Sequence, residues 1–136
     1  MKGYAVQVFG ELPQAMMALA ETVVENLPDE DGLRCHEVAR VVYGVLVAKY
    51  PTETGLELID GRYRHVDHSW LLVPGDTRHR RFILDPYAVG RLPMVQLVDS
   101  ICGLGAFYEP GADRVDIKTG WVQTHTVEIA RGLRIV

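Results

Sequence analysis

The sequence predicts one α+β domain, in which two N-terminal helices pack on an antiparallel β-sheet. Apolar residues recur at helical spacing in the first half of the chain, and short apolar runs bounded by turn residues fill much of the second half. Helices that precede a set of strands, instead of alternating with them, are typical of α+β folds. A chain of 136 residues has room for one hydrophobic core, so we expect a single domain over residues 1–136.

Two helices are expected in the first half. The first covers residues 12–27 and is followed by Pro28, and the second covers residues 35–49 and stops before Pro51. Their apolar stripes consist of Leu12, Ala15, Met16, Leu19, Val23 and Leu27, and of Val38, Val41, Val42, Val45 and Leu46. Cys35 therefore falls in the first turn of the second helix, where free N–H groups and a partial positive charge are found.

Strands are expected to follow, over residues 55–59, 65–73 and 81–84. Asp60-Gly61 is interpreted as a turn after the first strand, and Pro74-Gly75-Asp76 as the turn of a hairpin between the second and third. In the last part of the chain we expect a short helix around residues 94–101 and further strands at 115–117, 121–122 and 126–129.

The composition excludes several classes of protein. The chain is 48% apolar and 24% charged, with a net charge of −4 and with acidic and basic residues mixed. No apolar run approaches the roughly 20 residues needed to cross a bilayer, and the first residues lack the apolar core of a signal peptide. The one basic cluster, residues 78–81, lies in a predicted hairpin turn. We therefore expect a cytoplasmic protein that binds neither a membrane nor specific nucleic acid, and its oligomeric state is left open.

Three residues of types that commonly act in catalysis occur in order along the chain: Cys35, His68 and Asp85. A thiolate, rather than a thiol, is the nucleophile, and a helix N-terminus or a nearby imidazolium favours the thiolate. His68 lies near the start of one predicted strand and Asp85 at the end of the next, so the hairpin places them side by side. We expect Cys35 to be a nucleophile, His68 its base and Asp85 the residue that orients the imidazole.

These motifs resemble the transglutaminase-like branch of the papain-like superfamily, including its bacterial cysteine-proteinase relatives. In that family a cysteine starts a helix in a Cys-x-x-x-Ala-like stretch, a histidine begins a His-x-Trp-like strand, and an aspartate ends the next strand in a Leu-Asp-Pro-like turn. Cys35, His68 and Asp85 stand at these positions, and Gly61 matches a glycine that often precedes the histidine strand. The resemblance covers residues 32–87.

The resemblance implies a papain-like fold and a thioester acyl-enzyme formed on an amide of a protein or a peptide-like substrate. Family members are peptidases, amidases, deamidases or acyl transferases, and none of these activities requires a cofactor. The backbone N–H of Cys35 is one expected oxyanion donor. Gln7 and Gln14 are the candidates for a second donor, although neither lies in a clear motif.

A metal site is the main chemical alternative. Zinc binds cysteine and histidine, and the candidate ligands are Cys35, His36, His65 and His68. Histidines three residues apart on a strand face opposite sides, and adjacent helix residues diverge, so this interpretation is disfavoured. His65 is also an alternative base, but it lacks the tryptophan and apolar strand that follow His68. His125 is a weaker alternative base, because no acid accompanies it.

Several residues near the motifs are expected to be structural. Trp70 is expected in the core, Cys102 in a structural role, and Arg34 and Glu37 on a solvated helix start. The same fold with an inactive triad would be a binding or assembly module, which is the alternative function.

Overall fold

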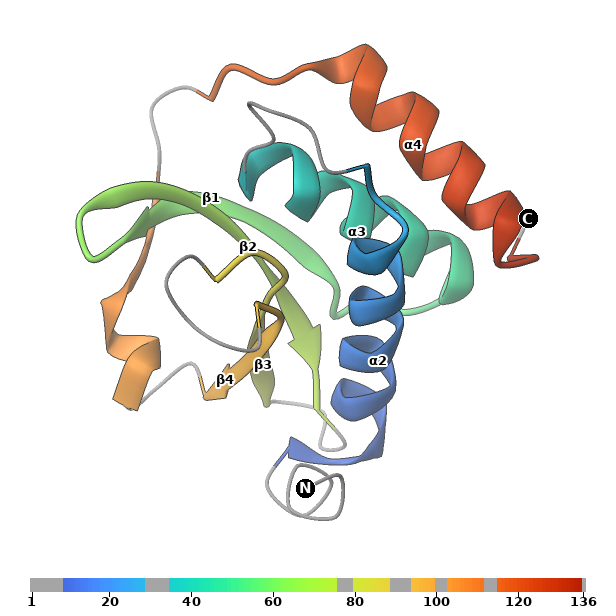
Figure 1. Cartoon of the computed structure of the whole chain (residues 1–136). Coiled ribbons are helices and arrows are strands. Elements are labelled where there is room, and N and C mark those ends of the chain that lie inside the picture. The colour runs from blue at the N-terminus through green and yellow to red at the C-terminus, as the bar shows by residue number, and fades with distance from the viewer. Residues whose placement is uncertain are drawn as a thin grey trace.

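The computed structural model describes residues 9–28, 35–75, 80–88, 94–99, 103–111 and 115–135. Helices and an antiparallel sheet are both present, which confirms the α+β class (Figure 1). The elements in chain order are α2 (Glu11–Glu25), α3 (Cys35–Lys49), β1 (Glu57–Tyr63), β2 (Val66–Pro74), β3 (Arg81–Asp85), β4 (Gln96–Asp99), the 3₁₀ helix η1 (Gly103–Phe107), β5 (Tyr108–Pro110) and α4 (Thr119–Gly132).

Helices α2 and α3 lie within two residues of their predicted bounds. The buried residues of α2 recur every three or four positions, as one helix face requires: Pro13, Met16, Ala20 and Val23. All five residues of the stripe predicted for α3 are buried. The backbone N–H of Tyr50 still bonds the carbonyl of Leu46, and Pro51 then prevents a further turn.

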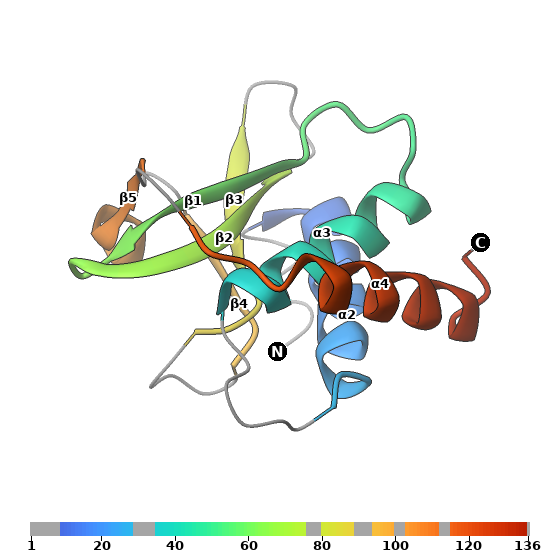
Figure 2. The ribbon, with the colours of Figure 1, turned by 90° about the horizontal axis from the view of Figure 1, so that it is seen from above.

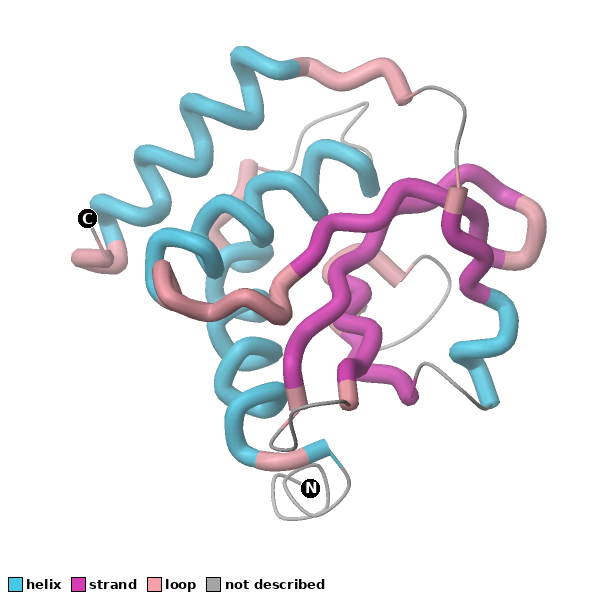
Figure 3. The backbone as a smooth tube through the Cα atoms, turned by 180° about the vertical axis from the view of Figure 1, so that it is seen from behind, coloured by secondary structure: helices cyan, strands magenta, loops and turns pink. Residues whose placement is uncertain are grey.

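The sheet has five strands in the order β4-β3-β2-β1-β5, and every neighbouring pair is antiparallel. Strands β1 to β4 form a meander, whereas β5 returns to the free edge of β1. The predicted hairpin is confirmed, since β2 pairs with β3 and Leu71 stands opposite Leu84. The first turn of α3 lies beside β1 and β2, and the helices gather on one side of the strands (Figures 1 and 3).

The sheet is strongly curled. Strand β5 is three places from β3, so about 14 Å would separate the two strands on a flat sheet. The Tyr108 hydroxyl of β5 nevertheless lies 2.6 Å from Asp85 Oδ2 at the end of β3. The curl therefore brings one edge of the sheet over its middle and creates a concave face.

Each face of the sheet has its own apolar cluster. The larger cluster lies under the helices, and its members from the strands and the segments next to them are Leu56, Leu71, Val73, Phe82, Leu84 and Val95. The smaller lies on the concave face and consists of Trp70, Ile83, Val98 and Tyr108. Alternate residues of β2 and β3 contribute to opposite clusters, as the two-residue period of a strand requires.

The C-terminal segment differs from its prediction, because α4 replaces the expected strands at residues 121–122 and 126–129, and residues 115–117 form no strand. Trp121, Val122 and Ile129 all pack on the main core. Val122 and Ile129 are seven residues apart, which puts them on one face of a helix but on opposite faces of a strand. Helix α4 runs along α3, where a Cβ on Gly44 would lie 2.7 Å from Thr126 (Figure 2). None of the described helices is both long enough and apolar enough to cross a membrane.

Two shorter predictions were also wrong. Asp60 and Gly61 do not form a turn but lie inside β1, and the turn follows at Arg64 and His65, both with positive φ. Gly61 is required for close approach, since a Cβ there would lie 2.1 Å from the Glu109 carbonyl oxygen of β5. The helix expected around residues 94–101 is strand β4 over its described part.

Candidate active site

The three predicted site residues come from three elements that meet at one end of the concave face. Cys35 is the first residue of α3 and is partly buried. His68 is the third residue of β2 and Asp85 is the last residue of β3, and both are buried. The antiparallel pairing of β2 and β3 places the first part of β2 beside the last part of β3.

His68 interacts with both of the other residues. Its Nε2 lies 2.8 Å from Asp85 Oδ2, and Cys35 is close enough to the same ring to help raise the pKa of His68. Since Nε2 faces the carboxylate, Nδ1 is the ring nitrogen left to face the thiol. The structure thus brings together all three residues that the sequence selected.

Asp85 is held by two further donors. Its Oδ2 accepts a hydrogen bond from the Tyr108 hydroxyl at 2.6 Å, and its Oδ1 accepts one from the backbone N–H of Tyr87 at 3.1 Å. The Tyr87 contact spans two residues, as in the local turns that aspartate forms with its own backbone. Asp85 is fully buried, so these bonds replace the water that its charge would otherwise require.

His68 is held in its charged form. Burial alone would disfavour the imidazolium, but hydrogen bonds to Asp85 and Cys35, together with the charges of both groups, raise the pKa of His68 to about 9. An imidazolium beside Cys35 near neutral pH is the electrostatic setting that favours a thiolate.

Aromatic rings surround His68. The Trp70 ring stacks at 6.2 Å, and the rings of Tyr63 and Tyr108 lie at 6.1 and 6.3 Å. Trp70 is 1% exposed, which confirms its expected place in the core. This wall shields the His68–Asp85 pair from water, and so strengthens the electrostatic interactions within it.

A hollow of about 340 Å³ opens on the concave face beyond this wall, at the small end of the volumes typical of ligand pockets. Trp70 and Tyr108 line it and also contact the triad region. The remaining lining residues are Ile59, Leu72, Arg81, Ile83 and Pro110.

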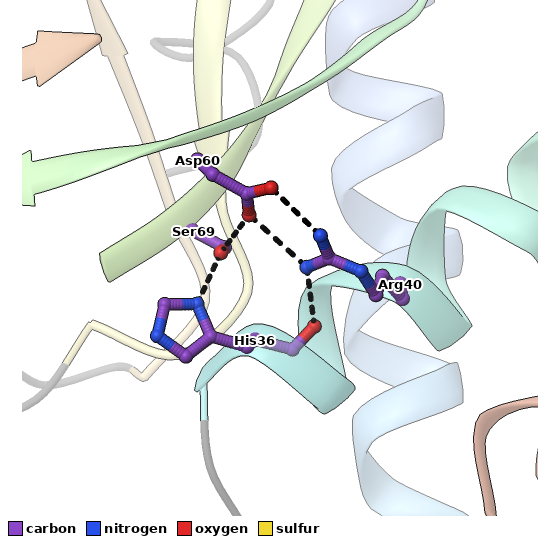
Figure 4. Close-up of polar contacts among 4 residues, drawn as sticks. All are labelled: His36, Arg40, Asp60 and Ser69. Atoms are coloured by element: carbon purple, nitrogen blue, oxygen red, sulfur yellow. Dashed lines mark hydrogen bonds and ion pairs between the residues drawn. The ribbon is translucent and has the colours of Figure 1, made fainter. Parts of the chain in front are cut away.

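The residues that follow Cys35 are buried, which corrects one prediction. Glu37 is 1% exposed rather than solvated, and its Oε2 accepts a hydrogen bond from the backbone N–H of Lys118 at the start of α4. The sequence could not indicate this, because α4 approaches α3 from more than 80 residues away. His36 is also buried, and it bonds Ser69 in a second polar cluster with Arg40 and Asp60 (Figure 4).

The alternative bases lie elsewhere. His65 is in the turn before β2 with its side chain 87% exposed, 3.6 Å from Glu109. His125 is on α4, where its Nδ1 lies 2.8 Å from the Trp121 carbonyl oxygen. Within the described ranges, no three His, Cys, Asp or Glu side chains are grouped as a metal site would require.

Of the two candidates for a second oxyanion donor, the structure describes only Gln14. Gln14 lies in the first turn of α2, and its Oε1 is buried without a hydrogen-bond partner among the described residues. Gln7 lies outside the described residues, as do Arg34 and Cys102.

Tyr108 is the site residue that sequence reasoning missed. It lies 23 positions after Asp85 in a three-residue strand, and reaches the carboxylate only because the sheet curls. Its position in an apolar stretch before Glu109 and Pro110 gave no sign of a partner.

Comparison with known proteins yields no match: no family model fits the chain, and neither a curated protein nor a solved structure matches it.

Proposed function

We propose that this protein is a cysteine-dependent hydrolase or acyl transferase that acts on an amide of a protein or peptide-like substrate. The observation that carries the proposal is the buried His68–Asp85 hydrogen bond beside the partly buried Cys35, in which the pKa of His68 is raised to about 9 by its interactions with both residues. A helix that begins with the cysteine and an antiparallel sheet that carries the other two residues also suit a papain-like, transglutaminase-like core.

In the proposed reaction, the Cys35 thiolate attacks the amide carbonyl carbon, and the electron pair of the C=O bond moves to oxygen. The backbone N–H of Cys35 is placed at a helix start to receive that oxyanion. The intermediate then collapses, the C–N bond breaks, and His68 gives its Nδ1 proton to the departing amine. Asp85 keeps the imidazole oriented throughout.

The thioester that remains is released by a second attack. His68, now neutral, takes a proton from water or from an amine as it attacks the acyl carbon, and the Cys35 thiolate leaves. Water gives hydrolysis or, for a side-chain amide, deamidation, whereas an amine gives acyl transfer.

The experiment that tests this proposal is the rate of Cys35 alkylation against pH, with both cysteines followed separately by mass spectrometry. In the parent protein we expect Cys35 to react well below the free-thiol pKa of about 8.5 and faster than Cys102. In His68→Ala that advantage should disappear. His65→Asn is the matched control, because it changes an exposed histidine of the same hairpin and asparagine tolerates the positive φ of 69°.

An alternative function as a binding or assembly module predicts a different result. Cys35 would then titrate as an ordinary thiol or stay inert in all three proteins, and the substitution of His68 would leave its rate unchanged. If His65→Asn removed the advantage instead, the base would be His65.

A further inference from the structure

The second polar cluster, His36, Arg40, Asp60 and Ser69, joins α3 to the sheet (Figure 4). Because successive residues of β2 face opposite sides, Ser69 and this cluster lie on the other face from His68. His36 and Arg40 come from the first two turns of α3, Asp60 from β1 and Ser69 from β2. Ser69 is fully buried, and even Asp60 has only 27% of its side chain exposed. The cluster is therefore part of the helix–sheet contact and not a surface ion pair.

The four residues form a closed ring of hydrogen bonds whose donors can be assigned. Burial opposes the charge of Asp60, but hydrogen bonds from Arg40 and Ser69 and the charges of Arg40 and His36 keep its pKa below the ordinary value. Asp60 is thus ionised, and Ser69 donates its one hydroxyl proton to Asp60 Oδ1 at 2.5 Å. The contact of Ser69 Oγ with His36 Nδ1, also 2.5 Å, then requires the histidine to donate.

Arg40 closes the ring. Its two terminal nitrogens bond the two oxygens of Asp60 at 3.1 and 2.7 Å, and Nη1 also donates to the His36 carbonyl oxygen at 3.2 Å. The planar guanidinium fixes both the carboxylate and the first turn of the helix, which a single-point contact would not do.

The ring lies one residue away from the proposed reacting pair. His36 directly follows Cys35 in α3, and Ser69 directly follows His68 in β2, so the His36–Ser69 bond ties the two backbones together next to both groups. Asp60 is the register partner of Ser69, so α3 is fixed to two strands at once. Since successive strand residues face opposite sides, Ser69 can bond the helix while His68 faces Asp85.

Apolar packing alone would fix the position of α3 on the sheet less narrowly. Hydrophobic contact is non-directional, whereas hydrogen bonds to charged groups prefer narrow distances and angles. A partly buried ring of charged groups also costs desolvation that an apolar contact avoids. Its advantage is therefore a defined position of the helix on the sheet rather than stability. The position of the helix matters at Cys35, because a displacement of about 1 Å between reacting groups can cost about a hundredfold in rate.

We propose that Asp60 and Arg40 are positioning residues, which act through Ser69 and His36 to hold the Cys35 thiol against the His68 imidazole. The inference rests on the proposed function, since it concerns the geometry of that same pair.

Asp60→Asn tests the ring, because it keeps the size of the side chain and removes its charge. We expect Cys35 alkylation at pH 7 to fall about tenfold or more while near-UV circular dichroism still reports a folded protein. Arg40→Lys should give a smaller loss, since lysine keeps the charge but cannot bond both carboxylate oxygens. Glu57→Gln is the matched control. Glu57 lies on β1, as Asp60 does, and its substitution breaks an exposed ion pair with Arg81 of β3, so the rate should stay within about twofold of the parent.

The titration of His68, followed by NMR of its ring, is a readout that lost stability alone would not move. The contact with Cys35 helps to raise the pKa of His68. If Asp60→Asn loosens that contact, the midpoint should move downward, in the same direction as we expect for Cys35→Ala, which removes the contact altogether.

A folded Asp60→Asn with the parental alkylation rate and an unchanged His68 titration would overturn the proposal, as would an equal loss in Glu57→Gln. If Asp60→Asn does not fold, the same measurements on Ser69→Ala decide, because it opens the ring at another bond. A Ser69→Ala that also fails to fold would leave the ring a structural role only. Failure of the proposed function is distinct, since Cys35 of the parent would then react independently of His68.

Discussion

Strand β2 separates two polar clusters that are built from similar groups. On the concave face, Asp85 accepts hydrogen bonds from His68 and the Tyr108 hydroxyl. On the helix face, Asp60 accepts them from Arg40 and the Ser69 hydroxyl. Each carboxylate therefore has one hydroxyl and one cationic partner. The partner of Asp85 is an imidazole and that of Asp60 is a guanidinium.

This difference determines what each cluster can do. A guanidinium keeps its proton at any pH at which proteins fold, so the Asp60–Arg40 pair is permanent and suits a positional role. An imidazole gains and loses its proton within the accessible pH range, so the Asp85–His68 pair can exchange a proton with Cys35. Asp85 and Cys35 both raise the pKa of His68, so they favour the protonated imidazole.

The largest expected effect comes from Asp85→Asn, which removes the carboxylate charge from the cluster on the concave face. Asparagine keeps the size of aspartate but cannot hold the His68 proton, and its amide N–H₂ favours the wrong tautomer of the ring. We expect Cys35 alkylation at pH 7 to fall by about a hundredfold or more, and the pKa of His68 to fall below its parental value of about 9.

The comparison with Asp60→Asn, made with the same alkylation and NMR titrations, tests whether the two clusters have separate roles. The Asp60 variant should lose less reactivity, because it disturbs position and leaves the charge partner of His68 in place. Equal losses in the two variants would mean that the clusters do not have separate roles.

The dependence of stability on pH is the next largest effect. His68 has a pKa of about 9 in the folded protein and an ordinary value near 6.5 in the unfolded chain. Because the folded pKa is raised, its stabilising contribution is fully present below about pH 6.5 and is lost as the pH rises towards 9. The shift corresponds to about 3 kcal/mol of unfolding free energy, which urea denaturation across this range would detect.

His68→Gln is the control for this decline. It keeps a polar side chain of similar reach but does not titrate, so the loss of stability between pH 6.5 and 9 should be much smaller in this variant. The Asp60–Arg40 pair should contribute no such decline, since its carboxylate is already ionised throughout this range. An unchanged decline in His68→Gln would assign it to another group.

The meeting of His68 and Asp85 was predictable because it depends on local features, as does the position of Cys35 at a helix start. The α3 stripe and Pro51 define the helix that Cys35 begins, and the hairpin turn sets the register of β2 and β3. A strand start beside a strand end follows from antiparallel pairing alone. The approach of Cys35 to His68 is different, because it depends on how α3 packs on β2, and the sequence indicated it through the resemblance to a known family.

The parts that could not be predicted depend on contacts between distant segments. Gly61 resembled a turn glycine, but its space is taken by the backbone of Glu109, which arrives only when β5 returns to the sheet. Glu37 resembled a solvated residue, but α4 covers it. Helix α4 was itself mistaken for strands, since its apolar residues occur in short β-branched groups and its helical period shows only over the whole segment.

Tyr108→Phe should give the smallest effect and is the sharpest test of how Asp85 acts. The ring stays in the aromatic wall, and the loss of one hydrogen bond to a buried carboxylate should reduce the unfolding free energy by about 1.5–3 kcal/mol. With one donor fewer, Asp85 attracts the His68 proton more strongly, so the pKa of His68 should rise, opposite in direction to the change in Asp85→Asn. NMR titration of the two variants distinguishes the signs. If both lower the pKa, Tyr108 supports the fold of the site without tuning the charge of Asp85, and its position beside the carboxylate is a matter of packing.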